Sequence, residues 1–349
     1  MRPAKWVALC LSALLLLSAC HDGIELTDRA FVIGFAIDKE GDNVSVTLSI
    51  ANVEAVSDRG DPEDLEELLE AEAPSLAAAM REVNNGVSSS VFFGHAKLLV
   101  LGENLLKDPI KLENVLDTLQ RNNEINHRII VLAAENASET LDYEKNKEPL
   151  LGFFVQNFFE NNDAPVPQMD LEVLINKMRT GQTALIPMIN LDEGVEISGA
   201  AVVDDFEFIG WLDEEEAIGL AWFLGKPAGA VVTTDDAAFE VIRSRRKVRF
   251  VERSGVLHCY ITLTVNGNLT SGKGDNRNLQ NEFEREIADI LMTTFEKLYC
   301  ELNTDGFGLR EKLRRQNRRL YLEHGDNIAD TVEFNVGVTV RLVDSGAVK

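Results

Sequence analysis

The chain has 349 residues, 45% of them hydrophobic, and its 58 acidic and 34 basic side chains give a formal net charge of −24. This length and apolar content allow real hydrophobic cores, which excludes a wholly disordered chain and favours two or three domains over one. The acidic balance excludes a general nucleic-acid-binding protein, because neutralising phosphates requires a basic face. We therefore expect no nucleic-acid partner.

The first twenty residues have the pattern of a bacterial lipoprotein signal. Arg2 and Lys5 precede an uncharged apolar run that ends in Leu17-Ser18-Ala19-Cys20. That run is shorter than the roughly 20 residues that a membrane-spanning helix needs, and it suits the core of a signal peptide. We expect residues 1–19 to be removed and the Cys20 thiol to carry a diacylglyceryl group. The alternative is an ordinary secretion signal with a cysteine at its cleavage site by chance.

The expected anchor is hydrophobic, because an acidic chain is repelled by an anionic bilayer. Two acyl chains suffice, since each buried methylene contributes about 0.8 kcal/mol. No later segment is long and apolar enough to span, so we expect the mature protein to lie on a membrane without crossing it. Of the remaining cysteines, Cys259 and Cys300, we expect two buried free thiols, with a disulfide between them as the alternative.

The first half of the chain alternates predicted strands and helices. Residues 31–39 and 43–53 form a predicted hairpin around Glu40-Gly41-Asp42. Ser75 is a predicted helix cap, and the acid-rich residues 58–72 are a predicted solvated loop or helix face. The other predicted elements are strand 91–101, helix 112–121, strand 128–134, helix 137–143, helix 170–180 and segment 182–190. This order favours a sheet with at least one parallel crossover. His95, inside the predicted strand 91–101, is expected to be a hydrogen-bonded structural histidine.

The second half begins after Asp192-Glu193-Gly194, where we place a domain boundary. A predicted hairpin turns at Asp204-Asp205, and four acids at 213–216 favour the positive end of a helix over 214–224. The remaining predicted elements are strands 230–234, 239–252 and 256–270, helices 278–303 and 309–322, and an alternating strand 332–343. We expect an α+β, multi-domain protein with mixed sheets flanked by helices. Its predicted domains are 20–192 and 195–349, with a further division near residue 270 left open.

Two basic clusters contrast with the acidic composition. Arg243, Arg245, Lys247 and Arg249 recur with period two, which places them on one face of a strand with Arg246 opposite. A second set, Arg310, Arg314 and Arg318, recurs with helical spacing, with Arg315 and Arg319 alongside. One interpretation is two solvated surfaces paired with local acids. The other is contact with acidic loops of a partner or with lipid phosphates. Our candidates for that contact are Arg243, Arg245, Lys247, Arg249, Arg310, Arg314 and Arg318.

Other chemical patterns are weak. The five histidines have no metal-ligand spacing, and no motif of a nucleophilic or dinucleotide-binding site occurs. Residues 267–274 approach a phosphate-binding loop, but Gly274 stands where the loop requires Ser or Thr after Lys273. We interpret that segment as a flexible strand-to-helix loop. The sequence therefore predicts no enzyme activity, cofactor or metal.

Several short segments occur in an order typical of one protein family. They are residues 25–30 (ELTDRA) shortly after Cys20, 34–39 (GFAIDK), the helix from Ser75 leading to 93–97 (FGHAK), 199–202 (GAAV), 210–212 (GWL), 215–217 (EEA), 305–308 (DGFG) and the closing strand 336–341. In this order the whole mature chain resembles the Ger(x)C family of spore germination lipoproteins, the C subunits of nutrient germinant receptors. It departs from the family pattern in its Arg-rich run 310–319 and in its longer acidic insert at 58–72.

The resemblance implies a non-enzymatic subunit, tethered to the outer face of the spore inner membrane, that assembles with two integral-membrane receptor subunits. It also implies three small α+β domains in one rigid body. The rival interpretation is a solute-binding lipoprotein that delivers a ligand to a transporter. Such proteins have two doubly wound lobes with regularly repeating units, and the elements here do not repeat regularly.

Overall fold

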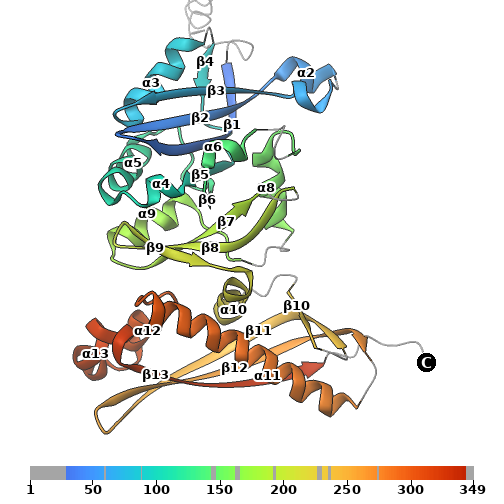
Figure 1. Cartoon of the computed structure of the whole chain (residues 1–349), viewed down its shortest axis with the longest axis vertical. Helices are drawn as coiled ribbons and strands as arrows, with labels where there is room; N and C mark the ends of the chain where they lie inside the picture. Colours follow the sequence, from blue (N-terminus) through green and yellow to red (C-terminus); the bar gives the residue numbers. More distant parts are fainter. Residues whose placement is uncertain are drawn as a thin grey trace, which may run out of the picture.

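The computed structural model describes residues 29–342 except 59, 88, 143–146, 162–165, 192–193, 226–229, 235–236 and 273–274. The predicted signal peptide and Cys20 lie outside the described residues. Two β-sheets with their helices follow one another along the long axis of the molecule (Figure 1). No helix in the described ranges combines the length and the apolar character needed to cross a bilayer.

The first sheet is mixed, with the order β3-β2-β1-β5-β6-β7-β8-β9, and β4 pairs with β1 beside β5. Strands β1, β5, β6 and β7 run parallel, which confirms the predicted crossover, while both ends of the sheet are antiparallel. The bounds are β1 Arg29–Glu40, β2 Asn43–Ala51, β3 Glu66–Ala73, β4 Ser90–Phe92, β5 Leu98–Gly102, β6 Ile130–Ala134, β7 Ala184–Asn190, β8 Glu196–Asp204 and β9 Glu207–Leu212.

Helices cover both faces of this sheet, so its central strands are apolar on both sides. In β5, Leu99 and Leu101 belong to one core, whereas Leu98 and Val100 belong to another. The first core is closed by α3 Leu76–Gly86, α4 Glu103–Leu106, α5 Pro109–Arg121 and α9 Leu171–Arg179. The second is closed by α6 Ala137–Thr140 and α8 Leu151–Glu160. Short helices α2 Val53–Asp58 and η2 Pro62–Asp64 connect β2 to β3.

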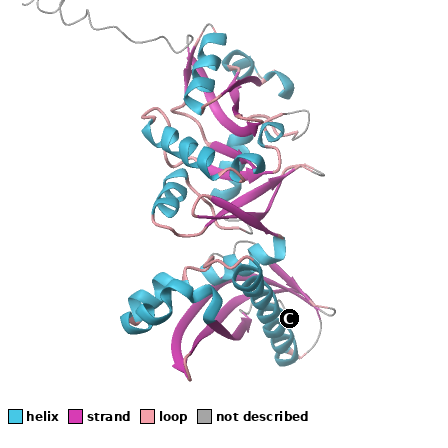
Figure 2. Ribbon diagram, turned by 60° about the vertical axis from the view of Figure 1, so that its left-hand side comes forward, coloured by secondary structure: helices cyan, strands magenta, loops and turns pink. Residues whose placement is uncertain are grey.

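The second sheet has four strands in the order β10-β11-β12-β13. They are β10 Val231–Thr233, β11 Ala237–Arg253, β12 Val256–Gly272 and β13 Val332–Leu342. The accompanying helices are α10 Glu214–Leu224, α11 Asn276–Phe295, its π-helical continuation η3 Glu296–Glu301, α12 Leu309–Gln316, α13 Arg318–His324, η4 Gly325–Asn327 and α14 Ile328–Thr331. Figure 2 shows helices gathered along one side of this sheet. The mixed α+β class is as expected.

One face of the second sheet packs against helices and the other is open. Phe283, Ile287 and Leu291 of α11 share a core with Cys259 and Ile261 of β12. The same core includes residues of β7, β8 and α10, so the helical layer lies between the two sheets and the open face is directed away from the first sheet. Burial alternates along β13 as the sequence predicts.

Local signals set several helix ends. The Ser75 hydroxyl accepts a hydrogen bond from the Ala78 amide, which confirms the predicted cap of α3. Asp213 and Glu216 form a reciprocal capping box at the start of α10, whose bounds match the prediction. The predicted β8–β9 hairpin is also present, with Asp205 and Phe206 at positive φ in its turn.

Four local predictions are wrong. The acidic segment contains a strand, because β3 pairs with β2 along its whole length. The predicted strand 91–101 is broken into β4 and β5 by a turn at Gly94 and His95. His95 is therefore exposed, and its ring lies 5.5 Å from that of Phe31. Residues 267–272 continue β12 and are no loop. The predicted basic helix 309–322 ends at Gln316, and Asn317 caps a separate α13.

Cys259 and Cys300 are both free thiols, but only Cys259 is buried. Burial raises the pKa of the Cys259 thiol to about 12, which leaves it unreactive. Cys300 lies on the exposed side of η3, so the expectation of two buried thiols is wrong for Cys300. The predicted domain boundary at 192–194 falls between β7 and β8, which pair within the first sheet; the domain limits stay a prediction.

Candidate functional site

The seven predicted contact residues separate into two places in the structure. Arg243, Arg245, Lys247 and Arg249 are exposed on β11, on the open face of the second sheet. Arg310 and Arg314 lie on α12, and Arg318 begins α13. The period-two pattern thus predicted one face of β11 correctly. The helical pattern did not give one continuous basic helix.

We call the open side of β11, β12 and β13 the basic sheet face, and its cross-strand register defines it. Arg243 lies opposite Asn266, Arg245 opposite Thr264, Lys247 opposite Thr262 and Arg249 opposite Tyr260. On β13 the neighbours of those four β12 residues are Arg341, Thr339, Gly337 and Asn335. Basic side chains therefore line β11 and one end of β13, with polar side chains between them.

Few acids reach the basic sheet face. Glu333 contacts His258, with 3.3 Å between the His258 Nδ1 and a carboxylate oxygen. The guanidinium groups of Arg249 and Arg253 lie 5.4 and 5.6 Å from the centre of the Tyr260 ring. Among the described residues, no carboxylate pairs with Arg243, Arg245 or Lys247. The face therefore presents unneutralised positive charge to solvent.

Arg246 points to the other side of β11 and has a structural role. Its guanidinium lies 4.6 Å from the centre of the Phe223 ring in the second core. Burial lowers the pKa of Arg246, and its Nε atom has no hydrogen-bond partner within the described residues. This confirms that Arg246 is separated from the exposed bases on the same strand.

The arginines of α12 pair with neighbouring acids. Arg310 pairs with Asp326 at 2.7 Å. Glu311 accepts hydrogen bonds from the Arg314 Nε at 2.6 Å and the Arg315 Nε at 2.7 Å. These hydrogen bonds lower the pKa of Glu311 to about 2. For Arg310 and Arg314 the structure therefore shows local ion pairs, while Arg318 is exposed and has none within the described residues.

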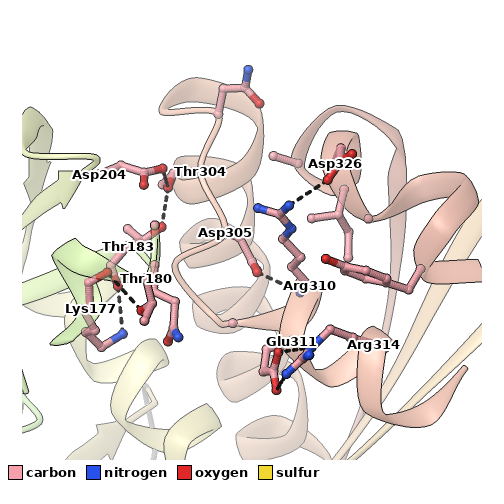
Figure 3. Close-up of a pocket in the computed structure, with 18 of the residues that line it drawn as sticks. Lys177, Thr180, Thr183, Asp204, Thr304, Asp305, Arg310, Glu311, Arg314 and Asp326 are labelled. Carbon is pink, nitrogen blue, oxygen red and sulfur yellow. Dashed lines mark hydrogen bonds and ion pairs between the residues drawn. The ribbon is translucent and has the colours of Figure 1, made fainter. Parts of the chain in front are cut away.

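A polar cavity of about 740 Å³ lies where α12 and its neighbours meet the first sheet (Figure 3). One wall comes from α9, the turn 180–183 that leads into β7 and the end of β8, and the other from residues 303–329. The Thr304 hydroxyl donates to Asp204 Oδ2 at 2.8 Å, and it lies 2.7 Å from the Thr183 hydroxyl. Because Thr304 has a single proton, Thr183 donates to Thr304. This chain of hydrogen bonds joins the two halves.

Asp305 organises the C-terminal wall of the cavity. Its carboxylate accepts hydrogen bonds from the Leu309 and Arg310 amides, both at 2.7 Å, and from the Tyr299 hydroxyl. Burial raises the pKa of Asp305. On the opposite wall the Lys177 ammonium donates to the Thr183 carbonyl at 2.8 Å, and burial lowers the pKa of Lys177. Asp305 and Lys177 are each hydrogen-bonded to groups of their own wall, so the arrangement is that of a structural junction.

Sequence reasoning missed one titratable cluster. Glu252, Glu323 and His324 offer ligand atoms within 4.8 Å of one another, although β11 and α13 are far apart in the sequence. The Arg319 guanidinium lies 3.0 Å from Glu252 and 3.9 Å from Glu323. The Arg319 guanidinium therefore already contacts both carboxylates, and only the tertiary structure could reveal the grouping.

Comparison with known families settles the identity of the fold. Residues 22–191 match a domain described as the spore germination protein N-terminal domain, and residues 198–346 match one described as spore germination B3/GerAC like, C-terminal. The chain belongs to this spore germination family. The resemblance to the Ger(x)C family inferred from the short segments is thereby confirmed.

Relatives cover nearly the full length of the chain. Spore germination protein YndF of Bacillus subtilis (strain 168) is 24% identical, over 98% of this chain and 96% of its own length. Spore germination protein B3 of the same strain is 22% identical over the whole of both chains. The crystal structure of the GerBC protein superposes with a TM-score of 0.62 at 19% identity, covering 93% of this chain and 100% of that one. The two proteins therefore share a fold.

Proposed function

We propose that this chain is a lipid-anchored, non-enzymatic subunit of a nutrient germinant receptor in bacterial spores. The supporting observation is the match of both family domains, which together span residues 22–346 with only a short gap. Relatives named as spore germination proteins align from end to end, so the role concerns the whole chain. The subunit is needed for the receptor to assemble and to trigger germination.

The proposed attachment is through Cys20. Residues 1–19 carry the signal-peptide pattern, and the lipid on Cys20 holds the folded part at the outer face of the spore inner membrane. Confinement to that surface raises the effective concentration of the subunit near its partners. Those partners are two integral-membrane subunits of the same receptor.

A cysteine substitution tests the attachment with a matched control. In Cys20→Ala the acyl anchor cannot form, so we expect the protein to be lost from washed spore membranes and germination in nutrients to slow at least tenfold. Cys10→Ala changes the other cysteine of the signal region and should leave both measurements unchanged. Firm retention of the Cys20→Ala protein with normal germination would contradict the proposal.

The cavity of Figure 3 is the observation that would favour the rival role of a solute-binding lipoprotein. Calorimetric titration of the purified chain with amino acids and sugars separates the two roles. We expect no saturable binding at micromolar concentrations, because the polar groups that line the cavity already bind one another. Tight, saturable uptake of one solute would support the rival.

A further inference from the structure

We propose that the basic sheet face binds an acidic segment of a partner polypeptide in an extended conformation. This deepens the proposed receptor role by naming a contact surface and the chemistry of its partner. The face consists of the open side of β11, β12 and β13, with Arg243, Arg245, Lys247 and Arg249 along one strand.

The bases of the face are not neutralised by acids from the described part of the chain. The protein has a net charge of −24, yet among the described residues no acid pairs with Arg243, Arg245 or Lys247. By contrast, Arg310, Arg314, Arg315 and Arg319 all have carboxylate partners at the surface. Free bases on one flat face make an electrostatic surface that attracts acids and speeds association.

The spacing of the bases favours an extended polypeptide. Alternate residues of a strand are separated by about 6.8 Å, so Arg245, Lys247 and Arg249 form a row with that repeat. An extended partner with acids at every second position has the same repeat and can pair with each base in turn. Tyr260 lies beside this row under the guanidinium groups of Arg249 and Arg253, and Tyr and Arg are the residues that dominate protein interfaces.

Two observations disfavour an anionic lipid surface as the partner. Binding to a bilayer interface strengthens with the apolar area that inserts as well as with charge. Beside the row on β11, the structure describes only one large exposed apolar side chain, Ile242, so there is little to insert. The face is also directed away from the first sheet, whereas β1 begins beside β4 at the other end of the molecule. A membrane attached through Cys20 therefore lies nearer the far end, and this second argument rests on the proposed function.

The experiment uses the full lipidated chain held in phosphatidylcholine nanodiscs. The protein is titrated into a fluorescent twelve-residue peptide that alternates Glu and Thr, and binding of the peptide is followed by fluorescence anisotropy. Arg245→Glu with Lys247→Glu should weaken binding at least tenfold, and Arg245→Gln with Lys247→Gln should give an intermediate loss. Arg277→Glu with Arg285→Glu makes the same charge change on exposed positions of α11, across the sheet, and should change binding less than twofold.

Three results would overturn the inference. The first is no binding of the acidic peptide, or equal binding of a peptide that alternates Lys and Thr. The second is an equal loss of binding in the α11 control, which would show a response to net charge alone. The third is that dihexanoyl phosphatidylglycerol, used below its micelle concentration, binds the face more tightly than the peptide does. The assay contains no other receptor subunit, so its failure would leave the proposed function standing, and failure of the Cys20 test would leave the binding result intact.

Discussion

Glu311 forms ion pairs with two arginines of α12. Its two carboxylate oxygens accept hydrogen bonds from Arg314 and Arg315, three and four residues ahead on the same helix. Side chains at this spacing face each other on a helix, so the pairs form within α12. Arg314 and Arg315 are thus already paired, whereas Arg243, Arg245 and Lys247 of β11 have no carboxylate partner among the described residues.

This arrangement predicts an unusual titration of Glu311. The two arginines lower the pKa of Glu311 from its ordinary 4.5 to about 2, because both hydrogen bonds favour the ionised form. A lowered pKa means that this carboxylate stabilises the fold above pH 4.5, and the contribution is lost as the pH falls toward 2. We expect the carboxyl carbon of Glu311 to titrate near pH 2 in an NMR experiment.

Two variants test the cause of that shift. Arg314→Ala with Arg315→Ala should return the pKa of Glu311 toward 4.5. Arg318→Ala removes an arginine that has no carboxylate partner within the described residues, and it should leave the pKa of Glu311 unchanged. A wild-type Glu311 that titrates near 4.5 would show that the ion pairs do not persist in solution.

At the scale of elements, one glycine lets β5 end beside β1. A Cβ at Gly102 would lie 1.7 Å from the Asp38 Oδ1 atom. Asp38 cannot easily move, because its carboxylate accepts hydrogen bonds from the Ala137 and Ser138 amides at 3.2 and 2.8 Å. The parallel register of β1 and β5 and the start of α6 therefore depend on the same small space.

We expect Gly102→Ala to lower the free energy of unfolding by roughly 1–3 kcal/mol, as for other overpacked sites. Gly34→Ala, in the neighbouring strand, is the control, since its nearest contacts would be at 3.5 Å. Urea unfolding followed by circular dichroism measures both. Equal stability of the two variants would mean that Asp38 can move away from α6 at little cost.

At the scale of the whole molecule, a short polar chain joins the two halves of the sequence. Thr304 is 1% exposed and binds both Asp204 and Thr183 through its hydroxyl. Replacing that hydroxyl by a methyl group takes this hydrogen bond from the buried Thr183 and the half-buried Asp204, which costs roughly 1–3 kcal/mol. The cost falls on the contact between the halves, because the three residues come from both.

Thr304→Val should therefore lower the free energy of unfolding by roughly 1–3 kcal/mol. It should also speed hydrogen exchange of the amides near residues 180–183 and 303–305. Thr339→Val makes the same change at an exposed position of β13 and should have little effect on either measurement. Unchanged exchange at the junction in Thr304→Val would show that the two halves are held by their apolar contacts alone.

The sequence by itself determined the features that depend on neighbouring residues. The capping box fixed the start of α10, the period-two pattern predicted the buried face of β13, and the same period placed the bases of β11 on one side. Each of these follows from the geometry of one helix or one strand. The family resemblance could also be recognised from neighbouring residues, because it rested on short sequence segments and on the order in which they occur.

The tertiary structure decided what depends on residues far apart in the chain. An acid-rich stretch became β3 because β2 offers it a partner edge. The strand expected over 91–101 divided into β4 and β5, which pair separately with β1 on either side of a turn. The same holds for the exposure of Cys300 and for the cavity between the halves. Strand pairing is set by long-range contacts, which leave no periodic trace in the sequence.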